Sequence, residues 1–309
     1  MKFLLFIIWL FVFTLSGSLY SEEMVVWNED FRGGVGSAKA YRGAEQVEVI
    51  EEEGESFLRV SLPGKVPLEG VRISLGAMDG NGLLMVRAKV RGSGSLGAMI
   101  QAANGWTRLP EMTLSEEWEE IKIPKTLKAG NNHPIIYFVS LPMDALQPGA
   151  VFEIADLEGT MSEPLALSDV EVRSMRLEVE DYAPTAQFVR IEDDVTCVVV
   201  SQSFATTEIP FPQTSRGVSL YVRYRAASLE DRIQICTRRG GYKQAVREVN
   251  PVTEGWQWME IPEIGTEEVG EGISIESWPK KGGGQVAALD ALVISTTPGL
   301  GETELESIK

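Results

Sequence analysis

The chain has little of what most enzymes use for acid–base catalysis: it contains one histidine, His133, among 309 residues. A single imidazole leaves few of the catalytic arrangements that use histidine as a general base. Lysine and arginine are also scarce, at 28 against 45 aspartates and glutamates, for a formal net charge of −17. Clustered cations bind nucleic acid and anionic membrane surfaces, so the sequence argues against both partners. The net negative charge also disfavours binding of strongly acidic glycans, unless a local basic patch makes the electrostatic potential positive there.

Long apolar runs are absent after the N-terminus. Lys2 precedes an apolar run from Phe3 to Leu15, and small residues follow at Ser18 and Ser21. This pattern predicts a signal peptide over residues 1–21, because the run is short for a membrane span. An uncleaved anchor is the alternative. We therefore expect an exported protein that is secreted, periplasmic or held at the cell surface, with no membrane span after signal removal.

Helical periodicity is missing as well, and short alternating segments take its place. Leu84, Val86, Ala88 and Val90 alternate with polar or flexible residues, which is typical of a half-buried strand. Similar runs recur along the chain between turns rich in glycine and proline, such as Asp79-Gly-Asn-Gly82. Many short strands of this kind predict an all-β sandwich or jelly roll.

One stretch occurs twice. Ser115-Glu-Glu-Trp-Glu-Glu-Ile-Lys-Ile-Pro124 is matched by Thr253-Glu-Gly-Trp-Gln-Trp-Met-Glu-Ile-Pro262. Self-similarity of this kind indicates a repeated structural unit. We expect two tandem β-sandwich domains: module 1 at 22–162, a linker at 163–174, module 2 at 175–297, and a flexible acidic tail at 298–309.

Module 2 resembles carbohydrate-binding modules of families 6 and 35. The resemblance is carried by Leu177-Glu-Val-Glu-Asp-Tyr182, the strand Gly217 to Ala226, Gly255-Trp-Gln-Trp258 and Leu289-Asp-Ala-Leu-Val-Ile-Ser-Thr296. Module 1 is similar to related galactose-binding-like modules that open with Asn-x-Asp-Phe, here Asn28-Glu-Asp-Phe31. The resemblance implies jelly rolls that bind glycans without catalysis. One departure is Ala288, at a place where the family often carries a sugar-bonding asparagine.

The resemblance also implies a structural Ca²⁺. Its ligands in module 2 would be Glu178, Glu180 and Asp290, and weaker equivalents in module 1 are Asp30 and Asp156. Hard carboxylate oxygens suit this ion, and alternate residues of one strand share a face. The alternative is that these carboxylates are solvated or cap turns.

Aromatic side chains are the candidates for sugar binding, because the apolar face of a pyranose ring can lie against an aromatic ring. Strand parity places Trp256 and Trp258 on the face opposite Met259 and Ile261, unless a bulge intervenes. The alternative for all candidates is burial in a core. The predicted sugar-binding residues are Trp106, Trp118, Tyr242, Trp256, Trp258 and Trp278.

Cys197 and Cys236 are the only cysteines, and both lie in apolar, strand-like runs of module 2. An exported chain favours a disulfide between them, whereas free cysteines are commonly small buried hydrophobic residues, and neither the spacing nor the flanking residues fix their proximity.

We expect a non-catalytic protein that binds a polysaccharide or other glycan, with a separate carbohydrate-active enzyme as a further partner. A structural or adhesive cell-envelope protein that binds protein partners is the first alternative. A polysaccharide-active enzyme is the second, although no nucleophile elbow, phosphate loop or paired catalytic carboxylates can be specified.

Overall fold

The computed structural model describes most of the chain after the N-terminus. It covers residues 23–80, 82–103, 105–109, 111–127, 130–141, 146–162, 173–183, 185–200, 207–210, 217–226, 232–239, 242–249, 255–264, 272–278 and 287–309. The predicted signal peptide and almost all of the predicted linker lie outside these residues. Among the described residues, no helix has the length and apolar character that a membrane crossing requires.

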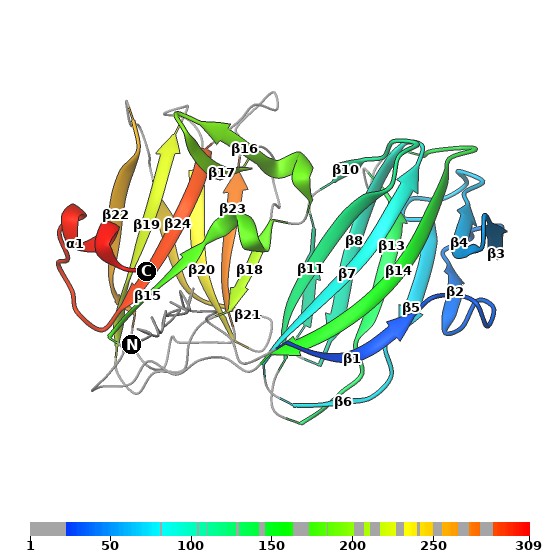
Figure 1. The fold of residues 1–309 in the computed structure, drawn as a ribbon, viewed down its shortest axis with the longest axis horizontal. Helices are drawn as coiled ribbons and strands as arrows, with labels where there is room; N and C mark the ends of the chain where they lie inside the picture. The colour runs from blue at the N-terminus through cyan, green and yellow to red at the C-terminus, as the bar shows by residue number, and fades with distance from the viewer. Residues whose placement is uncertain are drawn as a thin grey trace, which may run out of the picture.

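Module 1 is a sandwich of two antiparallel sheets (Figure 1). The first has the strand order β11-β7-β14-β4-β3, with β1 paired to β14, and the second has the order β10-β8-β13-β5-β2, with β9 paired to β8. The strands are β1 (Met24–Glu29), β2 (Ala38–Tyr41), β3 (Gln46–Glu52), β4 (Glu55–Ser61), β5 (Gly70–Ser74), β6 (Met78–Asp79), β7 (Gly82–Gly92), β8 (Ser95–Ala102), β9 (Gly105–Arg108), β10 (Met112–Thr113), β11 (Glu119–Leu127), β12 (Asn131–Asn132), β13 (Ile135–Ser140) and β14 (Val151–Ser162).

Module 2 repeats this topology. Its first sheet has the order β16-β17-β24-β19-β22 with β15 on β24, and its second has the order β18-β23-β20-β21. The two 3₁₀ helices, η1 (Val179–Tyr182) and η2 (Ala186–Phe188), follow β15. The strands are β15 (Ser174–Glu178), β16 (Val189–Glu192), β17 (Val195–Val200), β18 (Thr207–Pro210), β19 (Val218–Ala226), β20 (Arg232–Arg239), β21 (Tyr242–Val249), β22 (Gln257–Ile264), β23 (Gly272–Trp278) and β24 (Ala287–Ser295).

The repeated sequence stretch has the same place in both modules. In module 1 it leads into β11, which pairs with β7, and in module 2 it leads into β22, which pairs with β19. Ile121 and Ile123 are fully buried in the core of module 1, and Ile261 is buried in the core of module 2. The all-β fold of two tandem sandwiches is therefore confirmed, and the residues that face each core alternate along β7 and β19.

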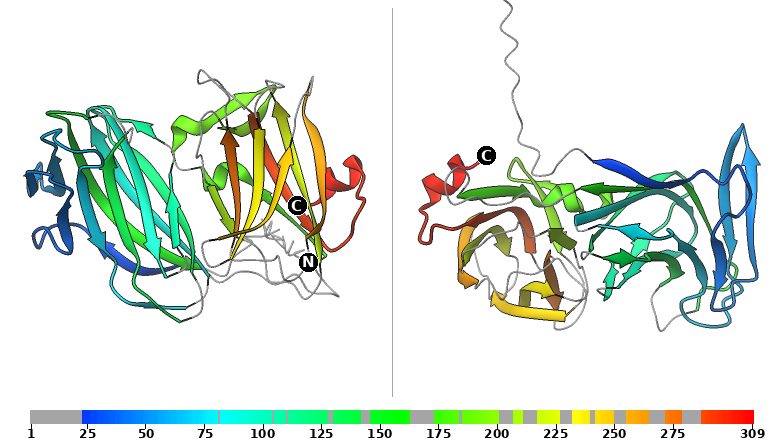
Figure 2. Two further views of the ribbon diagram at one scale, coloured as in Figure 1. Left: turned by 180° about the vertical axis from the view of Figure 1, so that it is seen from behind. Right: turned by 90° about the horizontal axis from the view of Figure 1, so that it is seen from below.

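The two modules pack against each other, as the views in Figure 2 show. Leu83 and Met85, on the outer face of β7, join the buried hydrophobic cluster of module 2. Phe188 contacts the cores of both modules. The Gln187 side chain donates to the Thr113 carbonyl at 2.8 Å and to Glu119 Oε2 at 2.6 Å. Both apolar burial and hydrogen bonds therefore fix the contact.

The C-terminus differs from the predicted flexible tail. Residues Glu302–Ser307 form helix α1, which lies on the outer face of the first sheet of module 2 (Figure 1). Leu305 is buried there with Tyr221 and Val293. The acidic composition suggested a solvated segment, but Leu305, with Leu300 and Ile308 packed beside it, anchors the short helix to an apolar patch.

Candidate functional site

The second sheet of module 1 presents aromatic side chains on its outward face. Residues whose side chains point into the sandwich alternate with those that point out, so Phe138 is in the core while Tyr137 faces outward. The strand register places Arg72 of β5 and Met99 of β8 opposite Tyr137, on either side. Tyr41 of β2 and Trp106 of β9 share this outward face. We call Tyr41, Trp106 and Tyr137 the aromatic face.

The three rings of the aromatic face are in contact. The centroids of Tyr137 and Trp106 are 5.1 Å apart with a tilted geometry, and those of Tyr137 and Tyr41 are 5.0 Å apart, edge to face. Trp106 is 46% exposed, whereas Tyr137 is 6% exposed. The Tyr137 hydroxyl donates to Gln101 Oε1 at 3.1 Å. The central ring is therefore held in place by its neighbours, while the indole at one end is open to solvent.

A buried carboxylate orders the loop beside this face. Glu69 is 1% exposed and accepts hydrogen bonds from the backbone N–H groups of Gly64, Lys65 and Val66, at 2.7 to 2.9 Å. Leu68 adopts a positive φ of 64° and packs against the buried cluster that contains Tyr137 and Val139. Satisfied buried hydrogen bonds of this kind hold the border of the aromatic face in one conformation.

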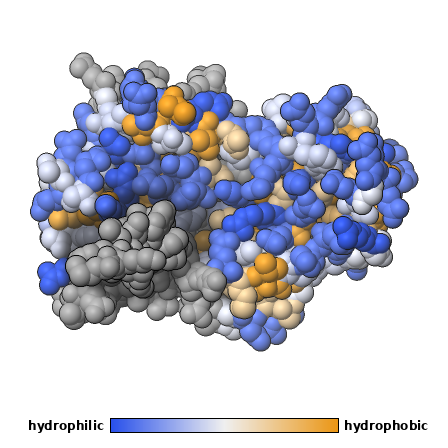
Figure 3. Space-filling model, viewed as in Figure 1, coloured by the Kyte–Doolittle hydropathy of each residue, from blue (hydrophilic) through white to orange (hydrophobic). Residues whose placement is uncertain are grey.

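Trp118 lies on the other sheet of module 1 and is not brought together with Trp106. Its ring meets Phe57 edge to face with centroids 5.6 Å apart, and the Arg91 guanidinium lies over it at 4.4 Å. Arg91 is also paired with Glu52, and both it and Arg59 bond the buried Glu153. The sheet that carries this network is predominantly hydrophilic on the side seen in Figure 3. Trp118 is part of an ion-paired surface with a packing role.

Trp256 and Trp258 line a depression of about 530 Å³ in module 2. The strand parity is as predicted: Met259 and Ile261 pack toward the core, and the bulge between β19 and β22 lies away from the two tryptophans. The depression is also lined by Tyr221, Glu260 and residues of the C-terminal segment. The Trp258 indole N–H donates to Glu306 Oε1 of α1 at 2.9 Å.

Glu260 in this depression is held as a carboxylate. Burial alone raises its pKa, but hydrogen bonds from the Gly299 N–H and from the hydroxyls of Ser219 and Tyr221 outweigh that effect and lower the pKa. These three donors lie 2.9 to 3.1 Å from Oε1. The arrangement links the C-terminal segment to the sheet and leaves little acceptor capacity on that oxygen.

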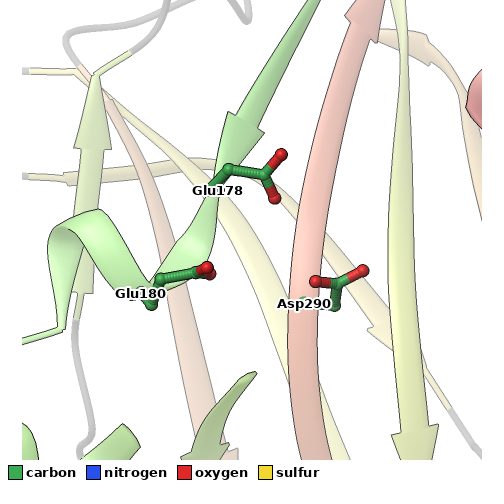
Figure 4. A group of neighbouring side chains, drawn as sticks. All are labelled: Glu178, Glu180 and Asp290. Carbon is green, nitrogen blue, oxygen red and sulfur yellow. The ribbon is translucent and has the colours of Figure 1, made fainter. Parts of the chain in front are cut away.

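Glu178, Glu180 and Asp290 converge on one point of module 2, as Figure 4 shows. One oxygen of each carboxylate lies within 4.8 Å of the other two. Glu178 ends β15, Glu180 is in η1, and Asp290 is in β24. The pairing of β19 with β24 is irregular beside Asp290, which is the kind of bulge that redirects a side chain.

The electrostatics of this acidic group suit a cation. Glu180 Oε2 is buried and has no hydrogen-bond partner among the described residues. Burial and then the neighbouring Glu178 and Asp290 raise the pKa of Glu180 to about 7. Carboxylate oxygens are the donors that Ca²⁺ prefers, although Arg176 already holds Glu178 Oε1 at 2.7 Å. Arg223 competes for Asp290, however, with its Nη1 2.6 Å from Oδ2.

The weaker module 1 equivalents do not form such a group. Asp156 is paired with Lys89 at 2.7 Å, and Asp30 lies 3.6 Å from Arg32. Among the residues that the structure describes, the only group of three convergent ligands is that of Glu178, Glu180 and Asp290.

The remaining candidates are placed by the backbone alone or are buried. Tyr242 begins β21 and Trp278 ends β23, and their side chains are outside the described part of the structure. Ala288 is fully buried in β24, so this position does not offer a polar group to a ligand. Cys197 and Cys236 are both buried and form no disulfide, and burial, with nearby carboxylates, raises the pKa of Cys197 to about 11.

Sequence reasoning missed Tyr41 and Tyr137, two of the three rings of the aromatic face. Tyr137 lies within Ile135–Leu141, which reads as a continuous apolar strand without the polar alternation that marks an outward face. Only the register of β13 with β5 and β8 shows that it shares a face with Trp106. No sequence signal for Tyr41 was available beyond its residue type.

No family model matches the chain, and no curated protein matches it. Similar solved structures include the N-terminal CBM22-1-CBM22-2 tandem domain of Paenibacillus barcinonensis Xyn10C, at 12% identity and a TM-score of 0.37, covering 89% of this chain and 98% of that one. Another is the family 11 carbohydrate-binding module of Clostridium thermocellum, solved with a β-1,3-1,4-mixed-linked tetrasaccharide. It has 17% identity and a TM-score of 0.34, and covers 46% of this chain and 96% of that one. At these identities and scores the likeness identifies neither a family nor a ligand.

Proposed function

We propose that the chain is an exported, non-catalytic protein that binds a polysaccharide, with the aromatic face of module 1 as the main contact. The observation that carries this proposal is the exposure of Trp106 beside Tyr137 on an ordered sheet. The face of a pyranose ring is apolar at its C–H bonds, so it gains from contact with an aromatic ring while its hydroxyls bond polar neighbours. Rigid rings lose little conformational entropy when they bind.

Polar groups flank the rings on the same face. Gln101 is directly opposite Trp106 in the register of β8 and β9, and Ser74 of β5 faces outward two strands away. Amide and hydroxyl groups of this kind can donate to and accept from sugar hydroxyls. The aromatic face therefore offers the two kinds of contact that a sugar requires.

Module 2 would supply a second contact with the same polymer. Trp256 and Trp258 share a depression with Tyr221, and the backbone places Tyr242 and Trp278 in β21 and β23 of the second sheet. That sheet occupies the place in module 2 that the aromatic sheet occupies in module 1. Two weak sites on one chain can bind a polymer more tightly than either alone, because the second contact is intramolecular.

The acidic group of module 2 would hold a structural Ca²⁺ through Glu178, Glu180 and Asp290. The buried Glu180 oxygen without a partner supports this assignment. The ion would offset part of the negative charge that these three carboxylates bring together and so tie β15 and η1 to β24. The resemblance of module 2 to families 6 and 35, and of module 1 to modules opening with Asn-x-Asp-Phe, stays a prediction that agrees with this assignment.

The predicted signal peptide bears on where the chain acts. The predicted signal peptide would direct the chain to a secreted, periplasmic or surface location, where polysaccharide is available. As a non-catalytic module pair, the chain would then serve a separate carbohydrate-active enzyme by holding its substrate, or attach the cell to the glycan.

The test is titration of the mature chain with a panel of soluble polysaccharides, followed by isothermal calorimetry and intrinsic tryptophan fluorescence. We expect saturable binding that Trp106→Ala weakens at least about tenfold, equivalent to ~1.4 kcal/mol. Trp118→Phe is the matched control, because it alters a tryptophan of the same module on the opposite sheet. Tyr137→Phe keeps the ring and should retain most of the affinity.

Two results would count against the proposal. If no polysaccharide binds the folded chain, the structural or adhesive alternative is favoured. If Trp118→Phe weakens binding as much as Trp106→Ala, the aromatic face is not the site.

A further inference from the structure

A pair of cations lies on the aromatic face. Lys39 of β2 and Arg72 of β5 are both exposed and directly opposite each other in the strand register. Arg72 is in turn opposite Tyr137. At the edge of the face, the Arg42 guanidinium lies 5.5 Å from the centroid of Tyr41, and its Nε donates to the Tyr41 hydroxyl at 3.2 Å. Positive charge is therefore next to two of the three rings.

Several other cations that the structure describes are held in ion pairs. Arg59 and Arg91 share the buried Glu153, and Arg176 and Arg223 share Asp290 and Glu306. Lys39 and Arg72, by contrast, form no ion pair with any carboxylate of the described residues. In a chain with 45 acidic and 28 basic residues, partners are plentiful. Both side chains lie open to solvent on the aromatic face.

Their juxtaposition also has a cost. Like charges directly opposite each other on neighbouring strands destabilise a sheet, in contrast to opposite charges at the same positions. Long exposed side chains can turn away from each other into solvent, which reduces this cost without giving the pair a role. The pair is explained if an anion that binds the aromatic face is drawn to both cations at once.

We propose that the aromatic face of module 1 binds a polysaccharide that contains hexuronic acid, with the carboxylate of one sugar placed between Lys39 and Arg72 while neighbouring rings contact Tyr137 and Trp106. This inference rests on the proposed glycan-binding function and specifies its ligand class. An arginine guanidinium matches a carboxylate with two parallel hydrogen bonds, and lysine adds a point charge. The local patch thereby reverses the repulsion that the net charge of −17 imposes on an acidic polymer.

The experiment compares polymers that differ only in charge. The mature chain is titrated by calorimetry with polygalacturonate and alginate, and with the carboxyl-reduced form of each, which keeps the backbone but is neutral. We expect at least one acidic polymer to bind at least about tenfold more tightly than its reduced form. The double variant Lys39→Gln/Arg72→Gln should lose that preference and retain its affinity for the reduced polymer.

A matched control variant shows whether the preference for the acidic polymer depends on Lys39 and Arg72 or only on the net charge of the chain. Lys122→Gln/Arg190→Gln removes the same two kinds of cation from the opposite sheet of module 1 and from module 2. The inference requires this control to keep the preference for the acidic polymer. It is overturned if neither acidic polymer is preferred, if the control loses the preference equally, or if dextran sulfate competes as well as the uronate polymer. Binding of a neutral polymer that depends on Trp106 without any acidic preference would overturn this inference and leave the proposed function standing.

Discussion

The guanidinium of Arg91 lies 4.4 Å from the centre of the Trp118 ring, on the outer face of the first sheet of module 1. Arg223 lies over Trp256 at 5.8 Å in module 2, also from the strand next to the repeated stretch. Both tryptophans of the repeat thus contact an arginine of the neighbouring strand. Cation–π contact and burial of the ring give this tryptophan a role in stability that does not depend on a ligand.

Replacement of Trp118 tests that role. Trp118→Ala removes the ring from its contacts with Phe57 and Arg91, and we expect a loss of about 2–3 kcal/mol of unfolding free energy, below the range for a fully buried tryptophan. Urea unfolding measures the loss. Trp106→Ala, which removes an exposed ring, should cost less than about 1 kcal/mol. Equal losses from the two variants would contradict the distinction between a packing and a binding tryptophan.

The C-terminal helix provides a second test. Leu305 is 2% exposed and packs on Tyr221 and Val293. Leu305→Ala should therefore destabilise module 2 by about 2 kcal/mol or more. Leu146→Ala changes a leucine that is 50% exposed and should stay within about 0.5 kcal/mol of the parent. Thermal unfolding followed by circular dichroism distinguishes them, and an undisturbed Tm for Leu305→Ala would show that α1 does not contribute to the fold.

The sequence predicted the strands and the repeat for a physical reason. Alternation along Leu84–Val90 reports which side chains face the core, and the same alternation recurs in β19. It also placed Trp256 and Trp258 on the outer face, because the period of two is strict where no bulge intervenes. Glu178, Glu180 and Asp290 come together although Asp290 is far from the other two along the chain.

The features that the sequence did not predict depend on contacts between residues that are far apart in the sequence. The aromatic face requires Tyr41, Tyr137 and Trp106 from three strands that are ordered only by the sheet register. The anchoring of α1 combines the buried Leu305 with the contact of Glu306 with Trp258, and composition does not distinguish this leucine from any other in an acidic segment. Neither relationship has a local pattern, so period and propensity do not detect it.

The module contact leads to a third prediction. Gln187 bonds both Thr113 and Glu119 across the interface, and Met85 is buried against module 2. In the parent chain we expect one calorimetric transition, because unfolding of either module exposes the surface of the other. Met85→Ala combined with Gln187→Ala should separate it into two transitions. Met24→Ala, at a methionine that is 65% exposed, is the control, and two transitions in the parent itself would show that the modules unfold independently.

Calcium should stabilise module 2 in a way that depends on Glu180 and on pH. Burial and the neighbouring carboxylates raise the pKa of Glu180 from 4.5 to about 7, so in the metal-free chain the folded state binds this proton more tightly than the unfolded state does. The resulting contribution to stability is full below about pH 4.5 and is lost as the pH rises toward 7. A bound cation requires the ionised carboxylate, so the rise in Tm that Ca²⁺ produces should be largest above pH 7 and shrink as the pH falls.

The measurement is thermal unfolding with Ca²⁺ and with a chelator, at several pH values between 4.5 and 8. Glu180→Gln should abolish the calcium effect and flatten the dependence on pH in chelator, because an amide neither ionises nor supplies a charged ligand. Glu51→Gln alters an exposed glutamate of module 1 and should leave both intact. If Ca²⁺ raises the Tm of Glu180→Gln as much as that of the parent, the ion binds elsewhere. If Ca²⁺ raises the Tm of neither the parent nor the variant, the three carboxylates are balanced by Arg176 and Arg223 alone. These are the two cations that already lie within 4 Å of Asp290.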